Sequence, residues 1–188
     1  MDLISVIRKF LKIKPNEVKP SFILFCHSFF LVSLIITAKT ARDTYFLKRY
    51  DNSFLPFMYI LTAITLWIVI RVVQTKLSKK NLILQNIILH SFFSVFTMLF
   101  FFVNEGIFVP ILYLWVEVIT ALMGMKFWEL AVNTFNSRQS KRLFGLIGAG
   151  GSVSAVVTGF SIQFLIKNLA SNFLILVSAI MIISCMFF

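Results

Sequence analysis

Residues Ser140–Phe160 read SKRLFGLIGAGGSVSAVVTGF, in which glycines follow two basic residues and precede a long apolar run. Such a stretch can form a phosphate-binding loop, or it can pack helices against one another in lipid. A dinucleotide loop needs GxGxxG after a strand, but Val153 stands where the third glycine belongs after Gly148 and Gly150, and no strand is predicted before them. A Walker loop, GxxxxGK followed by Ser or Thr, is also missing from the stretch. The spacing therefore speaks against a phosphate loop.

Small residues in the same stretch recur at every fourth position. Small side chains at this spacing let helix backbones approach closely in a membrane, where hydrophobic burial no longer drives association. We therefore predict a tightly packed, central membrane helix here. Its predicted packing surface contains Gly145, Gly148, Gly151, Ala155 and Gly159.

The composition of the whole chain agrees with a membrane environment. Of its 188 residues, 59% are apolar and only 13% are charged, and the mean hydropathy is +0.92. This leaves too little polar surface to cover a water-soluble domain. We predict an all-α integral membrane protein that is surrounded by the lipid bilayer.

Six segments have the roughly 20 apolar residues that a helix needs to cross a bilayer. Short connections join them, which favours antiparallel neighbours in one bundle of six transmembrane helices over residues 21–188. The six segments are Ser21–Thr40, Phe54–Val73, Leu82–Val103, Ile107–Ala131, Leu143–Ile166 and Asn172–Phe188.

The chain has 18 Lys and Arg residues against 7 Asp and Glu residues. In a soluble protein this excess would indicate a nucleic-acid partner, but in a membrane protein it reports topology, and we expect no nucleic acid. Twelve of the basic residues lie before the first segment, between the second and third, or between the fourth and fifth, and five lie on the opposite side. The positive-inside rule therefore predicts a cytoplasmic N-terminus, with residues 1–20 as a basic amphipathic arm.

Six helices with both ends in the cytoplasm are typical of one half of a twelve-helix transporter built from two repeats. The last segment ends in ISCMFF, with no polar residue after it. We therefore expect a second six-helix half, in the same chain or in another one.

Glu117 lies near the middle of the predicted fourth segment, in WVEVITALMGMKFWEL. A charge at the centre of a membrane helix costs about 2.5 to 3.5 kcal/mol, so this carboxylate should be protonated, paired or turned towards a wet cavity. Helical spacing puts Ala121, Gly124, Trp128 and Ala131 on the same face. This face either borders a substrate path, with Trp128 as a contact, or it holds a structural acid that is paired with a neighbouring helix.

Lys39, Arg42 and Asp43 fall within about one helical turn at the end of the first segment, in ITAKTARDTYFLKRY. The two cations share one flank of the helix, and Asp43, four residues after Lys39, can neutralise part of their charge. If the helix continues through this stretch, the two cations lie in a vestibule; if it stops near Ala38, they are interfacial anchors. Arginine suits bidentate contact with phosphate, whereas lysine acts as a compact charge.

Other polar residues have structural explanations. Lys126 precedes Glu129 by three residues, which predicts an ion pair along one helix face with a snorkelling lysine. His27 and His90 lie on separate apolar segments without a carboxylate spaced to orient them, so we expect packing or a helix-end hydrogen bond. HExxH, GxSxG and P-loop motifs do not occur. We predict no enzymatic activity, no metal site and no cofactor.

The chain resembles the ATP/ADP translocase-like nucleotide transporters of bacteria and plastids, a branch of the major facilitator superfamily. Three stretches carry the resemblance in order: AKTARDTYFLKRY at 38–50, Glu117 followed by FWELAVNTF at 127–135, and RQSKRLFGLIGAGGSV at 138–153. The chain looks similar to the N-terminal six-helix half of that family, and closest to its divergent free-living bacterial members. A basic residue late in helix 1 and a glutamate in helix 4 are associated with nucleotide exchange in the family. By position, the resemblance assigns these roles to Arg42, with Lys39, and to Glu117.

We therefore expect a secondary transporter in the bacterial inner membrane that exchanges an anionic solute, a nucleotide, by alternating access. Lys39 and Arg42 would attract phosphate, Glu117 would adjust the charge balance or carry a proton, and Trp128 or Tyr45 would contact a base. The alternative is a non-transporting membrane scaffold or sensor with a major-facilitator-like fold, which binds a protein or lipid partner.

Overall fold

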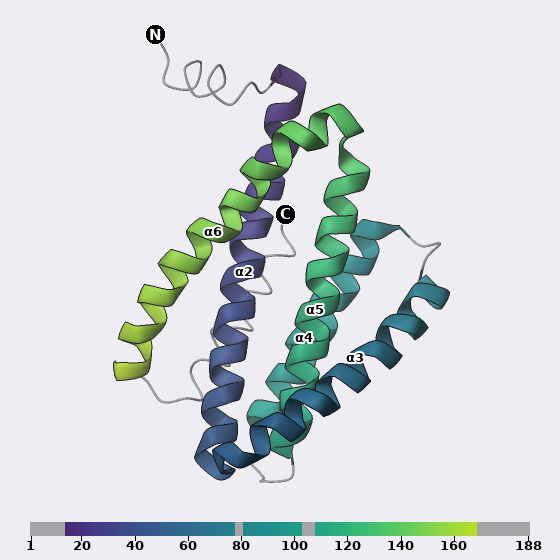
Figure 1. Cartoon of the computed structure of the whole chain (residues 1–188). Coiled ribbons are helices and arrows are strands. Elements are labelled where there is room, and N and C mark those ends of the chain that lie inside the picture. Colours follow the sequence, from purple (N-terminus) through teal and green to yellow (C-terminus); the bar gives the residue numbers. More distant parts are fainter. Residues whose placement is uncertain (1–13, 78–80, 103–107, 169–188) are drawn as a thin grey trace.

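The structure is a computed structural model that describes residues 14–77, 81–102 and 108–168. Within these ranges every regular element is a helix, and the helices form one bundle (Figure 1). In chain order they are α2 (Pro15–Arg49), the short 3-10 helix η1 (Asn52–Phe54), α3 (Leu55–Leu77), α4 (Leu82–Phe102), α5 (Phe108–Thr134) and α6 (Ser137–Asn168).

Long apolar helices indicate a membrane-associated protein, and the all-helical prediction is confirmed for the described residues. Within α4, the apolar stretch Leu82–Thr97 is shorter than the other apolar stretches. The predicted sixth segment, Asn172–Phe188, lies outside the described residues, as do residues 1–13 of the predicted arm. Among the described residues, four stretches are long and apolar enough to cross a membrane: Pro15–Leu47, Asn52–Val73, Phe108–Thr134 and Ser137–Ile162.

Helix α2 extends beyond both ends of the segment predicted from hydropathy. It begins at Pro15, where a proline has a helical φ and no N–H to leave unpaired. The Glu17 carboxylate accepts the backbone N–H of Lys14 at 2.9 Å. At its other end α2 continues through Thr40 to Arg49. Hydropathy marks only the apolar part of a helix, so it does not detect polar turns at the two ends.

Threonine hydroxyls in the second half of α2 donate to backbone carbonyls four residues earlier in the chain. The distances are 2.7 Å for Thr37, 2.8 Å for Thr40 and 2.7 Å for Thr44. These bonds satisfy the hydroxyls within the helix itself. The polar stretch can therefore remain helical among apolar neighbours.

Helix α5 lies at the centre of the bundle and contacts α2, α3 and α4, while α6 packs against α2 (Figure 1). Helices α2 and α6 run parallel. Near their starts Glu17 bonds to Arg142, and further along Ser33 bonds to Thr158, with the same separation of 125 residues in both pairs. The starts of α2 and α6 therefore lie on the same side of the bundle.

Helix α6 approaches α2 most closely at Gly150 and Gly151. A Cβ atom at Gly150 would meet the Phe25 carbonyl oxygen well inside contact distance, and it would lie 3.2 Å from the carbonyl carbon. A Cβ atom at Gly151 would lie 3.0 Å from Val32 Cγ2 and 3.2 Å from Ser28 Oγ. The missing side chains let the two helices pack at this distance, as expected for small residues in membrane helices.

Only part of the predicted packing surface of α6 lies in the contact with α2. Gly151 lies in the contact with α2, and Gly148 lies near the Trp128 ring, but Gly145, Ala155 and Gly159 are exposed. A strict four-residue repeat advances by about 400° per step, so it drifts around a helix of 3.6 residues per turn. The buried side of α6 instead combines steps of three and four residues: Leu143, Ile147, Gly150, Ser154 and Thr158.

Hydroxyl groups link α2 to α6 within this contact. Ser33 Oγ lies 2.6 Å from Ser154 Oγ and 2.8 Å from Thr158 Oγ1, and all three side chains are buried. Hydrogen bonds between membrane helices contribute about 0.6 kcal/mol each on average. The cluster therefore adds modest stability and fixes how the two helices align.

A second polar link joins the first turns of α2 and α6. Glu17 is buried, and its two carboxylate oxygens lie 2.7 and 2.6 Å from Arg142 Nη2. Gln139 Nε2 also donates to this carboxylate, at 3.0 Å. Gln139 and Asn136 exchange hydrogen bonds of 3.0 Å between side chain and backbone, which caps the start of α6.

Candidate functional site

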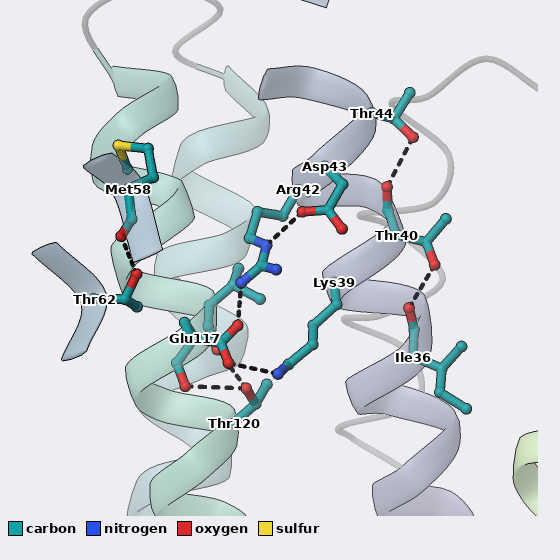
Figure 2. A network of polar contacts seen from close by, with 11 residues as sticks. Ile36, Lys39, Thr40, Arg42, Asp43, Thr44, Met58, Thr62, Glu117 and Thr120 are labelled. Atoms are coloured by element: carbon teal, nitrogen blue, oxygen red, sulfur yellow. Dashed lines mark hydrogen bonds and ion pairs between the residues drawn. The ribbon is translucent and has the colours of Figure 1, made fainter. Parts of the chain in front are cut away.

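Charged side chains from two distant segments meet between α2 and α5 (Figure 2). Lys39 Nζ lies 2.6 Å from Glu117 Oε1, and Arg42 Nη1 donates to Glu117 Oε2. Arg42 Nε donates to Asp43 Oδ1 at 3.0 Å. Glu117 is thus paired with two cations at once. This pairing supplies the partner that an ionised group in a membrane helix needs.

The length of α2 positions both cations. Because the helix continues to Arg49 and does not stop near Ala38, Lys39 and Arg42 are three residues apart on one helical turn. Both side chains can therefore reach the same carboxylate of Glu117 on α5. Of the two arrangements considered for these cations, the structure contains the one in which the helix continues.

Arg42 is the most enclosed of these charged groups. Its side chain is 7% exposed, against 35% for Lys39 and 27% for Glu117. The guanidinium carbon lies 4.0 Å from the centre of the Tyr113 ring. A cation over an aromatic face is stabilised by about 2 kcal/mol when the contact is desolvated. Arg42 is therefore held in place by two carboxylates and a ring, whereas Lys39 and Glu117 keep more access to the space beside them.

That space is a cavity of about 370 Å³ between α2, α3 and α5. It has the size of a small-molecule site. Its lining combines cations, a carboxylate, two phenol rings, a hydroxyl and aliphatic groups, all on apolar helices. The lining residues are Lys39, Arg42, Tyr59, Thr62, Ala63, Leu66, Tyr113 and Glu117.

The formal charges of the cluster cancel, because Lys39 and Arg42 face the carboxylates of Glu117 and Asp43. An anion that enters the cavity finds both cations already bound to Glu117. Because like charges repel at short distance, an outside anion would compete with Glu117 for these cations.

No family model, no curated protein and no solved structure matches the chain. The resemblance to ATP/ADP translocase-like transporters therefore stays a prediction. The functional argument depends on the geometry of this cavity.

Two residues predicted for the site lie apart from the cavity. Asp43 was expected to neutralise part of the charge of the two cations, and its carboxylate pairs with Arg42, but it does not line the cavity. Trp128 is 42% exposed, and its ring lies 5.7 Å from that of Phe144 on α6. Trp128 shares a helix face with Glu117, but eleven residues of α-helix span about 16 Å along the axis. This distance along the helix axis separates the two residues.

Among the lining residues with polar side chains, three were not predicted. Tyr113 precedes Glu117 by four residues and therefore shares its helix face, a signal that the sequence contains. Tyr59 and Thr62 belong to α3, which reaches the cavity only because it packs against α5. The spacing of residues along the chain contains no signal for this contact. Tyr45, considered for a base contact, does not line the cavity.

The remaining polar predictions concern other parts of the bundle. The pair between Lys126 Nζ and Glu129 Oε2 is confirmed, at 2.7 Å. His27 and His90 are buried, as expected for packing residues, and their rings lie 5.7 Å apart. Their contact joins α2 to α4 and could not be predicted from spacing within one helix.

Proposed function

We propose that this chain is a secondary transporter that exchanges an anionic, phosphate-bearing nucleotide across a membrane by alternating access, together with a second six-helix half. The observation that carries the proposal is the shared pairing of Lys39 and Arg42 with Glu117 on the wall of a cavity between apolar helices. A purely structural ion pair has no need of an adjoining cavity. These charges line one.

The two cations suit a phosphate-bearing ligand. Arg42 presents a planar fork of N–H donors, and Lys39 presents a compact charge on a flexible stem. Both already hold carboxylate oxygens, and phosphate oxygens are likewise negatively charged acceptors. Glu117 thus occupies the place that the oxygens of the ligand would take.

Competition for the cations gives Glu117 a role in release. Without Glu117 as a partner, Lys39 would be unpaired and Arg42 would keep only Asp43. Because Lys39 and Glu117 are partly exposed, this loss costs about 1 to 2 kcal/mol, less than the roughly 3 to 5 kcal/mol of a fully buried pair. Glu117 stabilises the ligand-free site by pairing with Lys39 and Arg42 again as the ligand leaves. An incoming anion displaces Glu117 from the two cations. The site therefore exchanges one anion for another without leaving its cations unpaired.

The aromatic lining provides a contact for the base. Tyr59 and Tyr113 line the same cavity, with ring centres 6.5 Å apart. Stacking of a base on an aromatic ring contributes about 1 to 3 kcal/mol. Because Arg42 lies over the Tyr113 ring, we assign the base contact to Tyr59.

Exchange of labelled ATP for ADP in proteoliposomes tests the proposal. Arg42→Ala and Glu117→Gln should each lower the exchange rate at least about tenfold, which corresponds to about 1.4 kcal/mol. Arg42→Lys should retain part of the activity, since the charge remains but the fork is lost. Unlabelled ADP should compete with ATP, whereas uncharged adenosine should not.

Matched controls come from charged residues outside the cavity. Arg138 and Asp51 are exposed and do not line it, so Arg138→Ala and Asp51→Asn should exchange at the rate of the unaltered protein. Full exchange by Glu117→Gln would contradict the proposal. A folded protein that exchanges no anionic nucleotide would also contradict it, and it would support the membrane scaffold or sensor.

A further inference from the structure

A second cavity, of about 210 Å³, lies between α2, α4 and α5 and shares no lining residue with the first. Its buried polar lining residues are His27, Asn86 and His90, with exposures of 6%, 4% and 2%. Ile83 and Ile87 on α4 line it as well, and they are 58% and 40% exposed. The cavity therefore has a polar floor and a mouth beside the apolar surface of α4.

The side chain of Asn86 contributes to this floor an acceptor that receives no hydrogen bond. Its Nδ2 donates to the carbonyl oxygens of Leu82 at 3.0 Å and of Lys126 at 3.4 Å. Carbonyl oxygens only accept hydrogen bonds, so these two contacts fix which way the amide is turned. Asn86 Oδ1 is buried and has no hydrogen-bond partner within the described part of the chain.

The imidazole ring of His90 contributes a second acceptor without a hydrogen-bond donor. Its Nδ1 lies 2.7 Å from the Asn86 carbonyl oxygen, so this nitrogen carries the ring proton and donates it. In the neutral ring Nε2 then has a free lone pair, and this atom is also buried without a partner among the described residues. No carboxylate occurs among the described residues that line the cavity. The ring therefore has no counter-charge here that would favour an imidazolium.

We propose that this cavity binds a small uncharged molecule with an apolar body and a hydroxyl group, of the phenol class. A ligand hydroxyl can donate to His90 Nε2 or to Asn86 Oδ1, and it relieves the cost of a buried acceptor without a donor. A charged ligand is disfavoured, because the described lining offers neither a carboxylate nor a cationic group to compensate it.

The size and the walls of the cavity agree with such a ligand. An apolar protein cavity of roughly 150 Å³ can hold a benzene molecule, so about 210 Å³ accommodates one substituted ring. Ile23, Leu24 and Leu130 provide aliphatic contacts for that ring. Because the mouth lies beside exposed isoleucines of an apolar helix, the ligand enters from the bilayer, where apolar molecules concentrate. The proposal does not depend on nucleotide exchange.

Nitrogen-15 NMR of the imidazole rings tests the site directly, since the chain has 2 histidines. In protein labelled at histidine and placed in lipid nanodiscs, phenol should shift the Nε2 signal of His90 towards the hydrogen-bonded range. Fluorobenzene has nearly the same size and no donor, and it should leave that signal in place. At equal concentration in the membrane, phenol should bind about fivefold more tightly, which is typical of one neutral hydrogen bond.

Substitutions test whether the NMR shift caused by phenol arises in this cavity. His27→Phe assigns the two sets of signals. Ile87→Trp, or Ile83→Trp if the first does not fold, fills the mouth and should abolish the shift, whereas Ile64→Trp on the exposed surface of α3 should not. Three results would overturn the proposal: the same shift with phenol and fluorobenzene, a shift that persists when the mouth is filled, or an Nε2 signal already hydrogen-bonded to water and unchanged by phenol.

Discussion

At the scale of single residues, Glu117 was the most informative position of the sequence. An acid within an apolar segment had to be protonated, paired or turned towards a wet cavity, and in the structure it is paired and lines a cavity. Its partner Lys39 lies 78 residues away in the chain. Helical periodicity relates only residues of the same helix, so it identified the acid and could not identify its partners.

Loss of the Glu117 charge should destabilise the protein, and loss of a matching cation should restore stability. Glu117→Gln leaves Lys39 and Arg42 with only the Asp43 carboxylate. Because Glu117 and Lys39 are 27% and 35% exposed, solvent screens part of the effect, and we expect a cost of about 1 to 2 kcal/mol, less than for a fully buried pair. Adding Lys39→Gln should recover at least half of this cost. Unfolding in mixed detergent micelles measures both changes.

Lys19→Gln is the matched control for Lys39→Gln, since Lys19 is an exposed lysine of the same helix. It should change stability by less than about 0.5 kcal/mol and should not rescue Glu117→Gln. A double variant at Lys39 and Glu117 whose two costs simply add would show that the residues are not energetically coupled.

At the scale of the helix, apolar runs located each described α-helix, but small-residue spacing did not identify the face that α6 turns to α2. The length of an apolar run depends only on the residues of that segment and on the thickness of the bilayer, so it can be determined from the sequence. Which face of a helix is packed depends on the helix beside it. Gly150 was left out of the predicted surface, yet it makes the closest approach because the Phe25 backbone passes beside it.

Alanine substitutions along α6 should distinguish the face that packs against α2 from the exposed face by their effect on stability. Gly150→Ala forces the backbones of α2 and α6 apart at Phe25 and should cost about 1 to 3 kcal/mol, as overpacking does. Gly159→Ala places its methyl group in open space and should leave stability unchanged or raise it by up to about 1 kcal/mol, because alanine favours the helix. Thermal unfolding of the purified protein compares them. Equal losses at both positions would refute the assigned interface.

At the scale of the whole molecule, the parallel arrangement of α2 and α6 constrains topology. The buried Glu17 holds Arg142 and Gln139, so the first turns of both helices lie on one side. The short helix between α2 and α3 lies at the other end of α2 (Figure 1). The excess of basic residues near the start of α2 predicts that this side faces the cytoplasm.

Cysteine labelling in intact cells tests this orientation. In a background without Cys26 and Cys185, Ser53→Cys should react with a membrane-impermeant maleimide added outside. Arg138→Cys should react only after the membrane has been opened. Both native residues are exposed. Ser53 belongs to η1, just after the end of α2, whereas Arg138 belongs to the first turn of α6, which is bonded to the start of α2. The reversed pattern would place the N-terminus outside, and labelling of both from outside would show that the chain does not span the membrane as proposed.

The sequence by itself determined the all-helical, membrane-associated character of the chain and singled out Lys39, Arg42 and Glu117. Apolar length and isolated charge are local properties, and the bilayer imposes the same demand on any segment that enters it. The tertiary structure alone decided that these three residues meet, that Tyr59 joins them while Trp128 does not, and that the acceptors of Asn86 and His90 share a second cavity. The physical reason is that contacts between helices depend on how each helix is rotated and shifted against its neighbours. That relation is a property of the packed bundle, and no single segment contains it.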